Sequence, residues 1–591
     1  MKLFVRSLLA VLVAASVACG GDGRPVEDSP DGKDAQALPH GKADSLYSAC
    51  EFDHIVLWLN DPATDVAALK VSGVHTRAAN NLIEHRNGPD GQLLTSDDDF
   101  FGDIEEVDDV YFVGPVALAQ LAGGVSSYCE KGDYGVQAET IFSPQPYHTS
   151  HLARVQELIE SAERSLDIAM YSFRDQGILQ AIEDAVDRGV SVRMIFQGTY
   201  DDRSEPAGSM SAKLEDAGVT VRWVNKIMHH KFVLVDGPRN TLLEAPGATL
   251  ASGSGNWSYS AGTRYDENTV VVRGDAELAL RFQKEFNHLW AHSRPFDWND
   301  ELVYFESMPI EAGMIPDHDG LDAKFTSANF RTYYSSRYGN TFSVERGRDE
   351  VSDRIVELIE EADESIWIAS GHLRSRPISE ALLQKWQDHP DMDIRIYLDG
   401  QEYISEWYHG EQERELVDCL DEAGDSEAQR QDCLDKGFYF SFEMQRAGIP
   451  TRFKYYSYRW HYTYAVQMHH KYLIFDGDTV ASGSYNLSDN AEHNTMENLV
   501  VYRASHYPQL VGAFVDNFTD IWETGRAEGV LGQLTDLIEN ATTQIPIVFE
   551  PMALTWQEVT DLKALIRDTC PAINSEDYRR YPEDHEVCYL D

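Results

Sequence analysis

Two ten-residue segments of this chain are nearly identical. Residues 228–237 read MHHKFVLVDG and residues 468–477 read MHHKYLIFDG, so each runs from His-His-Lys through an apolar stretch to Asp-Gly. GSGNWS (253–258) follows the first copy and GSYNLS (483–488) follows the second, and a Glu stands eleven residues after the Asn of each. Because these polar positions recur in one order, they indicate two copies of one domain.

The repetition extends to the flanking segments. VQELIESAERSLDIAMYSF (155–173) and IVELIEEADESIWIASGHL (355–373) each predict an amphipathic helix followed by a short apolar strand. A second helix and strand follow in both halves, and each half ends in a helix that contains Phe and Trp. Strands that alternate with helices predict layered α/β domains. We therefore expect two α/β domains that form a pseudo-dimer within one chain.

The two halves differ by insertions. About forty residues, Glu402 to Arg446, enter the second half before its motif, and about ten residues, PRNTLLEAPGAT (238–249), enter the first. At 591 residues the chain is too long for a single core. We predict a signal peptide (1–19), a flexible linker (20–45), a small helical domain (46–130), two α/β domains (138–300 and 310–530) and a C-terminal extension (531–591) whose role the sequence leaves open.

The N-terminus has the features of an export signal. Two basic residues in MKLFVR precede the apolar run SLLAVLVAASVA, which is too short to span a bilayer comfortably, and Cys19 follows at once. The ending Ser-Val-Ala-Cys resembles a bacterial lipoprotein box, in which Cys19 would carry the lipid. We expect an exported lipoprotein of the bacterial cell envelope, in the outer membrane or on the cell surface. The alternative is an ordinary signal peptide and a secreted protein.

The remaining six cysteines are an even number in an exported chain, which favours disulfides over reactive thiols. Their spacing suggests three pairs, and none shows the CxxC spacing of a zinc site. The predicted bridges are Cys50–Cys129, Cys419–Cys433 and Cys570–Cys588.

The charge balance argues against a polyanionic partner. Forty-nine basic and 99 acidic residues give a formal net charge of −50, whereas nucleic-acid binders usually carry the opposite sign. Residues 55–121 resemble the helix-hairpin-helix module, which binds DNA, but the first turn reads Gly73-Val74-His75 where that module has Gly-x-Gly. In addition, nine acidic residues and no Lys or Arg lie from Asp90 to Asp109. We expect a packing or docking domain there.

Strand geometry separates the two histidines of each motif. Residues two apart in a strand share a face, so His229 and Lys231 point one way and His230 points the other. The second copy repeats this arrangement, with His469 and Lys471 on one face and His470 on the other. We expect His229 and His469 to carry the chemistry, and His230 and His470 to tolerate replacement.

Each copy of the motif reads His-x-Lys, four residues and Asp, followed by Gly-Ser-x-Asn. This pattern resembles that of the phospholipase D superfamily, whose domains pair two such motifs across one active site. The resemblance covers roughly residues 138–525. It implies two αβ-sandwich domains with one shared site. It also implies a reaction that requires no metal or other cofactor, because the lysines supply the positive charge.

The resemblance also implies roles for the motif residues. His229 would be the nucleophile that forms a phosphohistidine, and His469 the general acid that later activates water or an acceptor alcohol. Glu267 and Glu497 would hold the imidazole rings. The groups expected around the non-bridging phosphate oxygens are Lys231, Lys471, Asn256 and Asn486.

Four further motif residues are predicted to have supporting roles. Asp236 and Asp476 are expected at strand ends, away from the reacting atoms, and the hydroxyls of Ser254 and Ser484 are expected to assist phosphate binding. The aromatic-rich segment 452–467 is interpreted as packing, with a wall of the substrate cleft as the alternative.

The sequence therefore predicts a phospholipase D-type phosphodiesterase that hydrolyses phospholipid head groups, held at a membrane surface by its lipid anchor. Three alternatives stay open. The protein could be a nuclease or other phosphodiesterase of the superfamily, a phosphatidyltransferase as in cardiolipin synthesis, or a non-catalytic surface binding protein. The oligomeric state is not predicted.

Overall fold

A computed structural model describes residues 35–37, 46–130, 135–198, 202, 205–296, 307–337, 339–459, 461, 463–540, 544–572, 574–585 and 587–588. The predicted signal peptide, the lipid-attachment residue Cys19 and most of the predicted linker lie outside the described residues. Inside the linker range, β1 (Ala35–Ala37) pairs antiparallel with β2 (Leu46–Ser48). This short ladder differs from the expected flexible linker, because β2 directly ahead of the first helix offers backbone groups to pair with.

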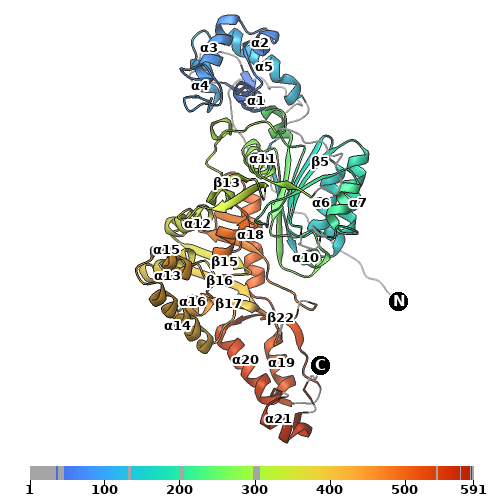
Figure 1. Cartoon of the computed structure of the whole chain (residues 1–591), viewed down its shortest axis with the longest axis vertical. Coiled ribbons are helices and arrows are strands. Elements are labelled where there is room, and N and C mark those ends of the chain that lie inside the picture. The colour runs from blue at the N-terminus through green and yellow to red at the C-terminus, as the bar shows by residue number, and fades with distance from the viewer. Residues whose placement is uncertain are drawn as a thin grey trace, which may run out of the picture.

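The first half forms an eight-stranded mixed sheet (Figure 1). Three neighbouring strands of this sheet run parallel to one another, and every other pair of neighbours is antiparallel, as expected for a layered α/β domain. In spatial order the strands are β11 (Arg294–Pro295), β6 (Thr220–Trp223), β5 (Ser191–Phe196), β4 (Ser165–Met170), β8 (Lys231–Val235), β9 (Thr249–Gly253), β10 (Glu267–Arg273) and β3 (Gln137–Ser143).

The second half repeats this sheet. Seven of its strands correspond one by one to strands of the first, which confirms the predicted pair of α/β domains. In the matching spatial order they are β22 (Val548–Thr555), β17 (Thr451–Ser457), β16 (Asp393–Asp399), β15 (Ser365–Ser370), β18 (Lys471–Phe475), β19 (Thr479–Gly483), β21 (Asn498–Arg503) and β12 (Leu321–Phe325).

Amphipathic helices cover the sheets. In α7 (Gln176–Asp187) the side chain of Asp175 caps the first turn, and Ile178, Leu179 and Ile182 are buried on one stripe. The remaining helices of the two domains are α6 (His151–Glu160), α9 (Met210–Asp216), α10 (Tyr259–Thr263), α11 (Ala276–Ala291), α12 (Glu350–Glu361), α13 (Arg376–Asp388), α14 (Glu406–Ala423), α15 (Glu427–Leu434), α16 (Ser441–Ala447), α17 (Asp489–Asn494) and α18 (Pro508–Trp522). A hairpin of β13 (Phe330–Ser335) and β14 (Gly339–Val344) projects from the second half.

The two halves exchange contacts reciprocally. Phe282 of α11 meets Phe325 of β12 edge-on, with ring centroids 5.2 Å apart. Phe514 of α18 meets Phe142 of β3 in the same way at 5.1 Å. The last helix of each half therefore packs on the first strand of the other, and one continuous hydrophobic cluster includes residues of both halves. Neither half would keep this surface buried alone.

Five helices form the N-terminal unit, which sits at one end of the elongated molecule (Figure 1). It docks on the insertion of the first half, a 3₁₀ segment η2 (Leu242–Gly247). The carboxylate of Asp61 accepts hydrogen bonds from Thr241 Oγ1 (2.6 Å) and Leu242 N (2.8 Å). Its helices are α1 (Ala49–Asn60), α2 (Val66–Val71), α3 (Thr76–Arg86), α4 (Ile104–Asp109) and α5 (Pro115–Cys129).

The C-terminal residues complete the second sheet. Strand β22 pairs antiparallel with β17, and α19 (Val530–Asn540) and α20 (Trp556–Thr569) flank it. Leu534, Ile538, Leu562 and Ile566 are buried in the core of the second domain. Residues 531–591, which also form the short helix α21 (Glu576–Arg580), thus extend that core.

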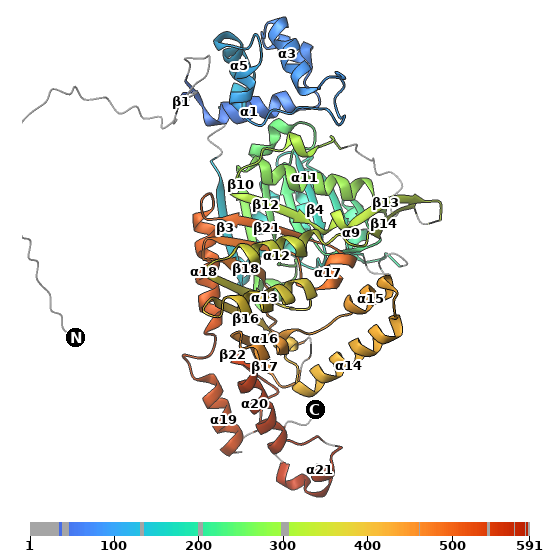
Figure 2. The ribbon, with the colours of Figure 1, turned by 90° about the vertical axis from the view of Figure 1, so that its left-hand side faces the viewer.

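The disulfides join the three pairs of cysteines predicted from the sequence, Cys50–Cys129, Cys419–Cys433 and Cys570–Cys588. The second of them links α14 to α15 in the large insertion, whose helices project from the second half in Figure 2. Among the described residues, no helix combines the length and the apolar character needed to cross a bilayer.

Candidate active site

The Lys of each motif begins a central strand, and the His lies two residues ahead of it. Lys231 and Lys471 begin β8 and β18, and their ammonium groups fold back onto the carbonyl oxygens of His229 (2.6 Å) and His469 (2.9 Å). Both lysines are buried. The predicted face is the observed one, since the histidine and the lysine of each pair lie together.

Short backbone ladders between the halves bring the two pairs into one site. Strand β7 (Ile227–Met228) pairs parallel with β20 (Thr495–Met496), and His229 N donates to Met496 O at 3.1 Å. At the related position His469 N donates to Asp266 O at 3.0 Å. The residue before His229 or His469 therefore lies beside the residue before the Glu of the opposite half.

This pairing crosses the carboxylates between the halves. Glu497 Oε1 lies 2.7 Å from His229 Nδ1, and Glu267 Oε1 lies 2.8 Å from His469 Nδ1. Both carboxylates are fully buried. A carboxylate at Nδ1 holds the ring proton there and leaves the Nε2 lone pair free. The sequence predicted that these residues hold the rings but not which Glu serves which His.

The Gly-Ser pairs fix the strands behind the site. A Cβ at Gly253 or Gly483 would lie 2.2 Å from the carbonyl oxygen of Asn268 or Asn498 on the neighbouring strand, which explains the glycines. Ser484 Oγ donates to Glu497 Oε2 at 2.7 Å, and Ser254 Oγ lies 3.2 Å from Asn268 Oδ1.

Both hydroxyls are fully buried. That Ser254 and Ser484 assist phosphate binding stays a prediction, although both hydroxyls already have hydrogen-bond partners within the protein. They face the neighbouring strand, and in the second half Ser484 holds the carboxylate of Glu497, which lies against His229.

Asp236 and Asp476 lie at the opposite ends of β8 and β18 from the histidines. Their φ angles of 52° and 51° place them in the left-handed region, which Asp tolerates better than most residues. Asp476 accepts hydrogen bonds from the backbone N–H groups of residues 363–365 at 2.7–2.9 Å, and Asp236 does the same for residues 163–165. Each Asp thus fixes the turn before β4 or β15.

Asn256 and Asn486 lie on the loops after β9 and β19 and are partly exposed. Their Oδ1 atoms are shielded from solvent and accept no hydrogen bond. The Asn256 loop bonds to the loop after β4, through Trp257 N and Ser172 O (3.0 Å), and the Asn486 loop bonds to the loop after β15, through Arg374 N and Leu487 O (2.7 Å). Backbone bonds therefore position both amides.

Burial controls the charges in the site. It lowers the pKa of His229 and of His469 well below the usual imidazole value, and the nearby lysines lower both further. Burial lowers the pKa of Lys231 to about 7 and of Lys471 to about 8, although the two glutamates oppose the shift. Neutral imidazoles beside cationic lysines suit attack on an anionic phosphodiester, whose charge would raise the lysine pKa values.

The two histidines differ in their surroundings. The ring of Tyr171 meets His229 edge-on at 4.5 Å, and Lys231 Nζ lies 5.0 Å from the centre of the same ring. The corresponding residue of the second half is Gly371, where a Cβ would lie 3.0 Å from Met468 O. The side chain of His229 is 10% exposed and that of His469 is 21% exposed.

Sequence reasoning missed Tyr171. An alignment of AMYSF (169–173) with ASGHL (369–373) would have shown that Tyr171 of the first half corresponds to Gly371 of the second.

His230 and His470 do not lie at a permissive surface. Both are fully buried between the halves. His230 Nδ1 accepts a hydrogen bond from Asn498 Nδ2 of the other half at 2.8 Å, and its Nε2 lies 3.3 Å from Glu285. The expectation that replacing these residues costs little activity stays a prediction. Because the reverse face of the motif strand forms the domain interface, replacement should instead cost stability.

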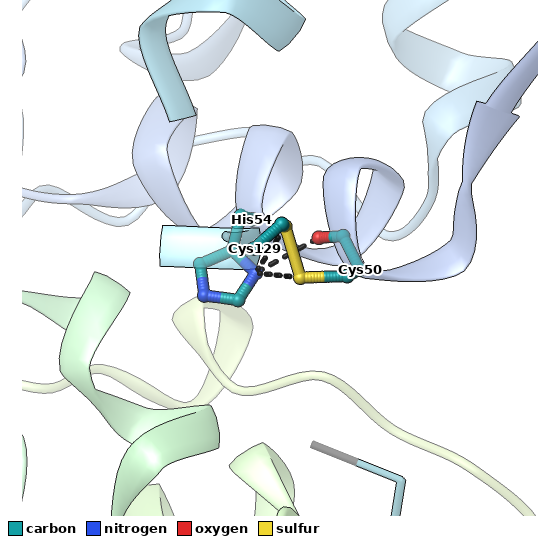
Figure 3. A group of neighbouring side chains, drawn as sticks. All are labelled: Cys50, His54 and Cys129. Atoms are coloured by element: carbon teal, nitrogen blue, oxygen red, sulfur yellow. Dashed lines mark hydrogen bonds between the residues drawn. A yellow bond between two sulfur atoms is a disulfide. The ribbon is translucent and has the colours of Figure 1, made fainter. Parts of the chain in front are cut away.

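The described residues contain three clusters with metal-ligating side chains, and none of them includes a residue of the candidate site. Figure 3 shows the cluster of Cys50, His54 and Cys129, in which the sulfur atoms are bonded to one another. His54 Nδ1 lies 2.8 Å from the carbonyl oxygen of Cys50, so this nitrogen donates to the backbone. The cluster is therefore a disulfide with a neighbouring histidine, because neither sulfur is a thiolate.

Comparison with known proteins gives consistent matches. A family model described as the PLD-like domain of cardiolipin synthase matches residues 155–290 and 355–522. The mitochondrial cardiolipin hydrolase of Xenopus tropicalis is 30% identical over 158 residues, 26% of this chain and 69% of the relative. That of Chlamydomonas reinhardtii is 34% identical over 146 residues, 24% of this chain and 59% of the relative.

A solved structure is also similar, that of Nuc, a phospholipase D family member from Salmonella typhimurium. It covers 27% of this chain and 97% of its own at 25% identity, with a TM-score of 0.23. The family model, in contrast, matches both halves of this chain, and each match includes a complete His-x-Lys and Gly-Ser-x-Asn pair. The chain belongs to the phospholipase D superfamily.

Proposed function

We propose that this protein hydrolyses the head-group phosphodiester bond of phospholipids through a phosphohistidine on His229. One observation carries the proposal. Two imidazoles, each with a carboxylate of the opposite half within 2.8 Å of its Nδ1, converge with two buried lysines at one site.

The residues allow a balanced two-step reaction. In the first step His229 Nε2 attacks phosphorus, the bond from phosphorus to the head-group oxygen breaks, and protonated His469 gives its proton to that oxygen. In the second step neutral His469 takes a proton from water, the hydroxide attacks phosphorus, and the phosphorus–nitrogen bond breaks. The products are phosphatidate, the head-group alcohol and the starting enzyme.

The charges of the site support this division of roles. Lys231 and Lys471 can stabilise the negative charge on the non-bridging oxygens as it shifts in the transition state. The phosphodiester anion in turn offsets the two lysines, which otherwise disfavour a protonated His469. Tyr171 covers His229 and restricts water there, whereas His469 is the more exposed ring and suits exchange of alcohol and water.

Lipid is favoured over nucleic acid as the substrate. The net charge of −50 opposes binding of a polyanion, and the two relatives compared are described as cardiolipin hydrolases. The test is an assay of purified protein with EDTA present, against labelled phospholipid vesicles and against single- and double-stranded DNA. Release of phosphatidate is expected, and cleavage of DNA without lipid hydrolysis would overturn the proposal. An added primary alcohol distinguishes hydrolysis from phosphatidyl transfer.

We also propose that Cys19 carries a lipid that keeps the enzyme at the membrane of the cell envelope. The apolar run and the Ser-Val-Ala-Cys ending support this location. Cys19→Ser should release the protein into the soluble fraction while leaving its activity on soluble phosphodiesters unchanged. Continued sedimentation with membranes would contradict the anchor.

A further inference from the structure

A pocket of about 580 Å³ opens beside Asn486. Its lining includes His372 and Arg374 from the loop after β15, Asp435 from the large insertion, and Asp489 and His493 from α17. Asn486 belongs both to this lining and to the candidate phosphate site. The pocket therefore borders the candidate site at Asn486.

The walls of the pocket are held firmly. Glu402, which is fully buried, binds His372 Nδ1 at 2.9 Å and Arg374 Nη2 at 2.6 Å. The Arg374 guanidinium also lies over the ring of Tyr439, 4.1 Å from its centre. Glu402 thus neutralises Arg374. The large insertion, which the Cys419–Cys433 disulfide braces, contributes Asp435 to the lining.

The two carboxylates of the pocket, Asp435 and Asp489, repel one another. Asp489 Oδ2 is shielded from solvent and accepts no hydrogen bond. Burial and, to a smaller extent, the neighbouring charge of Asp435 raise the pKa of Asp489 to about 7, although His493 and Arg376 oppose the shift. His493 itself is paired with Asp349 at 2.9 Å. A cation between the two aspartates would relieve this repulsion.

The pocket lies on the leaving-group side of the phosphate. His372 is close enough to His469 for its charge to lower the pKa of that ring, and His469 is the proposed proton donor to the head-group oxygen. A head group that leaves toward His469 with its phosphate at Asn486 would therefore enter the pocket.

We propose that this pocket binds the primary ammonium group of the phospholipid head group, with Asp435 and Asp489 as its acceptors. The inference rests on the proposed function for the orientation of the substrate. An ammonium group can donate charge-assisted hydrogen bonds to both carboxylates, and Asn490 and Asn494 also line the pocket. The lining contains no Trp, Tyr or Phe, so it lacks the aromatic cage that suits a quaternary ammonium.

The test compares vesicles of phosphatidylethanolamine, phosphatidylserine, phosphatidylcholine and phosphatidylglycerol as substrates. The wild type should prefer the first two, which share the primary ammonium; their ratio shows whether a head-group carboxylate is also tolerated. In Asp489→Asn and Asp435→Asn, kcat/KM for phosphatidylethanolamine relative to phosphatidylglycerol should fall about tenfold, the loss expected for one charge-assisted hydrogen bond. Asp425→Asn, in an exposed part of the same insertion, should leave this ratio unchanged.

A second measurement separates this inference from the proposed function. Phosphoethanolamine and inorganic phosphate are compared as inhibitors of bis(p-nitrophenyl) phosphate hydrolysis, which needs no lipid. Both aspartate variants should weaken inhibition by phosphoethanolamine about tenfold and leave inhibition by phosphate unchanged.

If the variants weaken inhibition by phosphoethanolamine while no phospholipid is cleaved, the proposed function fails but the pocket is still assigned to the ammonium group. If phosphatidylethanolamine is cleaved with no preference over phosphatidylglycerol, or if both variants keep the wild-type ratios, the pocket assignment is overturned. Retained turnover of bis(p-nitrophenyl) phosphate shows that the variants are folded.

Discussion

The crossed carboxylates make a prediction that a site assembled within one domain would not. Glu497→Gln alters a residue of the second half but should disable His229 of the first, from which it lies 2.7 Å. The carboxylate also accepts hydrogen bonds from Ser484 Oγ at 2.7 Å and Thr495 Oγ1 at 2.9 Å. An amide cannot satisfy all three partners, because only one of its two terminal atoms accepts.

The expected magnitude depends on how the amide lies. If its oxygen stays against His229, the tautomer is kept and only the negative charge is lost. If its NH₂ group faces His229, Nδ1 must accept a hydrogen bond, the proton moves to Nε2, and the nucleophilic lone pair disappears. The loss in the rate of phosphoenzyme formation should lie between about 10²-fold and 10⁴-fold for these two cases, or about 2.7–5.4 kcal/mol of barrier.

Burst kinetics with bis(p-nitrophenyl) phosphate measure that step, since p-nitrophenolate leaves without a proton. Glu497→Gln should abolish the fast burst. The matched variant Glu267→Gln, which perturbs His469, should keep the burst within about tenfold of wild type and slow the following turnover. If Glu267→Gln removes the burst and Glu497→Gln spares it, either the crossed pairing or the assignment of the nucleophile is wrong.

Three other predictions concern charge and packing. The kcat/KM should fall as the pH rises through 7 and 8, because Lys231, with a pKa of about 7, and Lys471, with a pKa of about 8, lose the protons that bind the phosphate. Lys471→Arg should shift the upper limb of the pH profile to higher pH. A flat profile up to pH 9 would contradict this reasoning. His230→Asn should lower the free energy of unfolding in urea by about 2 kcal/mol through the broken interface bonds, and an unchanged midpoint would refute that role. Asp61→Asn should weaken the contact between the helical unit and the first domain, so that residues 46–130 are cleaved faster in limited proteolysis while kcat stays unchanged. A decrease in kcat would show that this unit influences the active site.

The motif residues were predictable because local rules decide where they lie. Period-two alternation alone placed His229 with Lys231 and His469 with Lys471, and the repeat predicted two matching sheets. The pairing of Glu497 with His229 was not predictable, since it depends on how β7 of one half meets β20 of the other. No spacing within either half contains that information.

Other features escaped prediction for the same reason. The Gly-Ser turn directs Ser484 toward Glu497 because of the neighbouring strand, and strand β22 joins its sheet from about ninety residues beyond β17. The pocket beside Asn486 combines Asp435 of the insertion with α17, which are far apart in the sequence. Each of these features is a tertiary contact between segments that carry no common motif.

The most direct test of the shared-site mechanism is to locate the phosphoryl group on the trapped enzyme. His469→Asn should react with bis(p-nitrophenyl) phosphate but fail to activate water, so a p-nitrophenylphosphoryl adduct accumulates; quenching without acid and peptide mass spectrometry should find it on His229. His229→Asn, the matched control, should form no adduct. Finding the group on His469 in the control would reverse the two roles, and full turnover in either variant would contradict a site shared between the two halves.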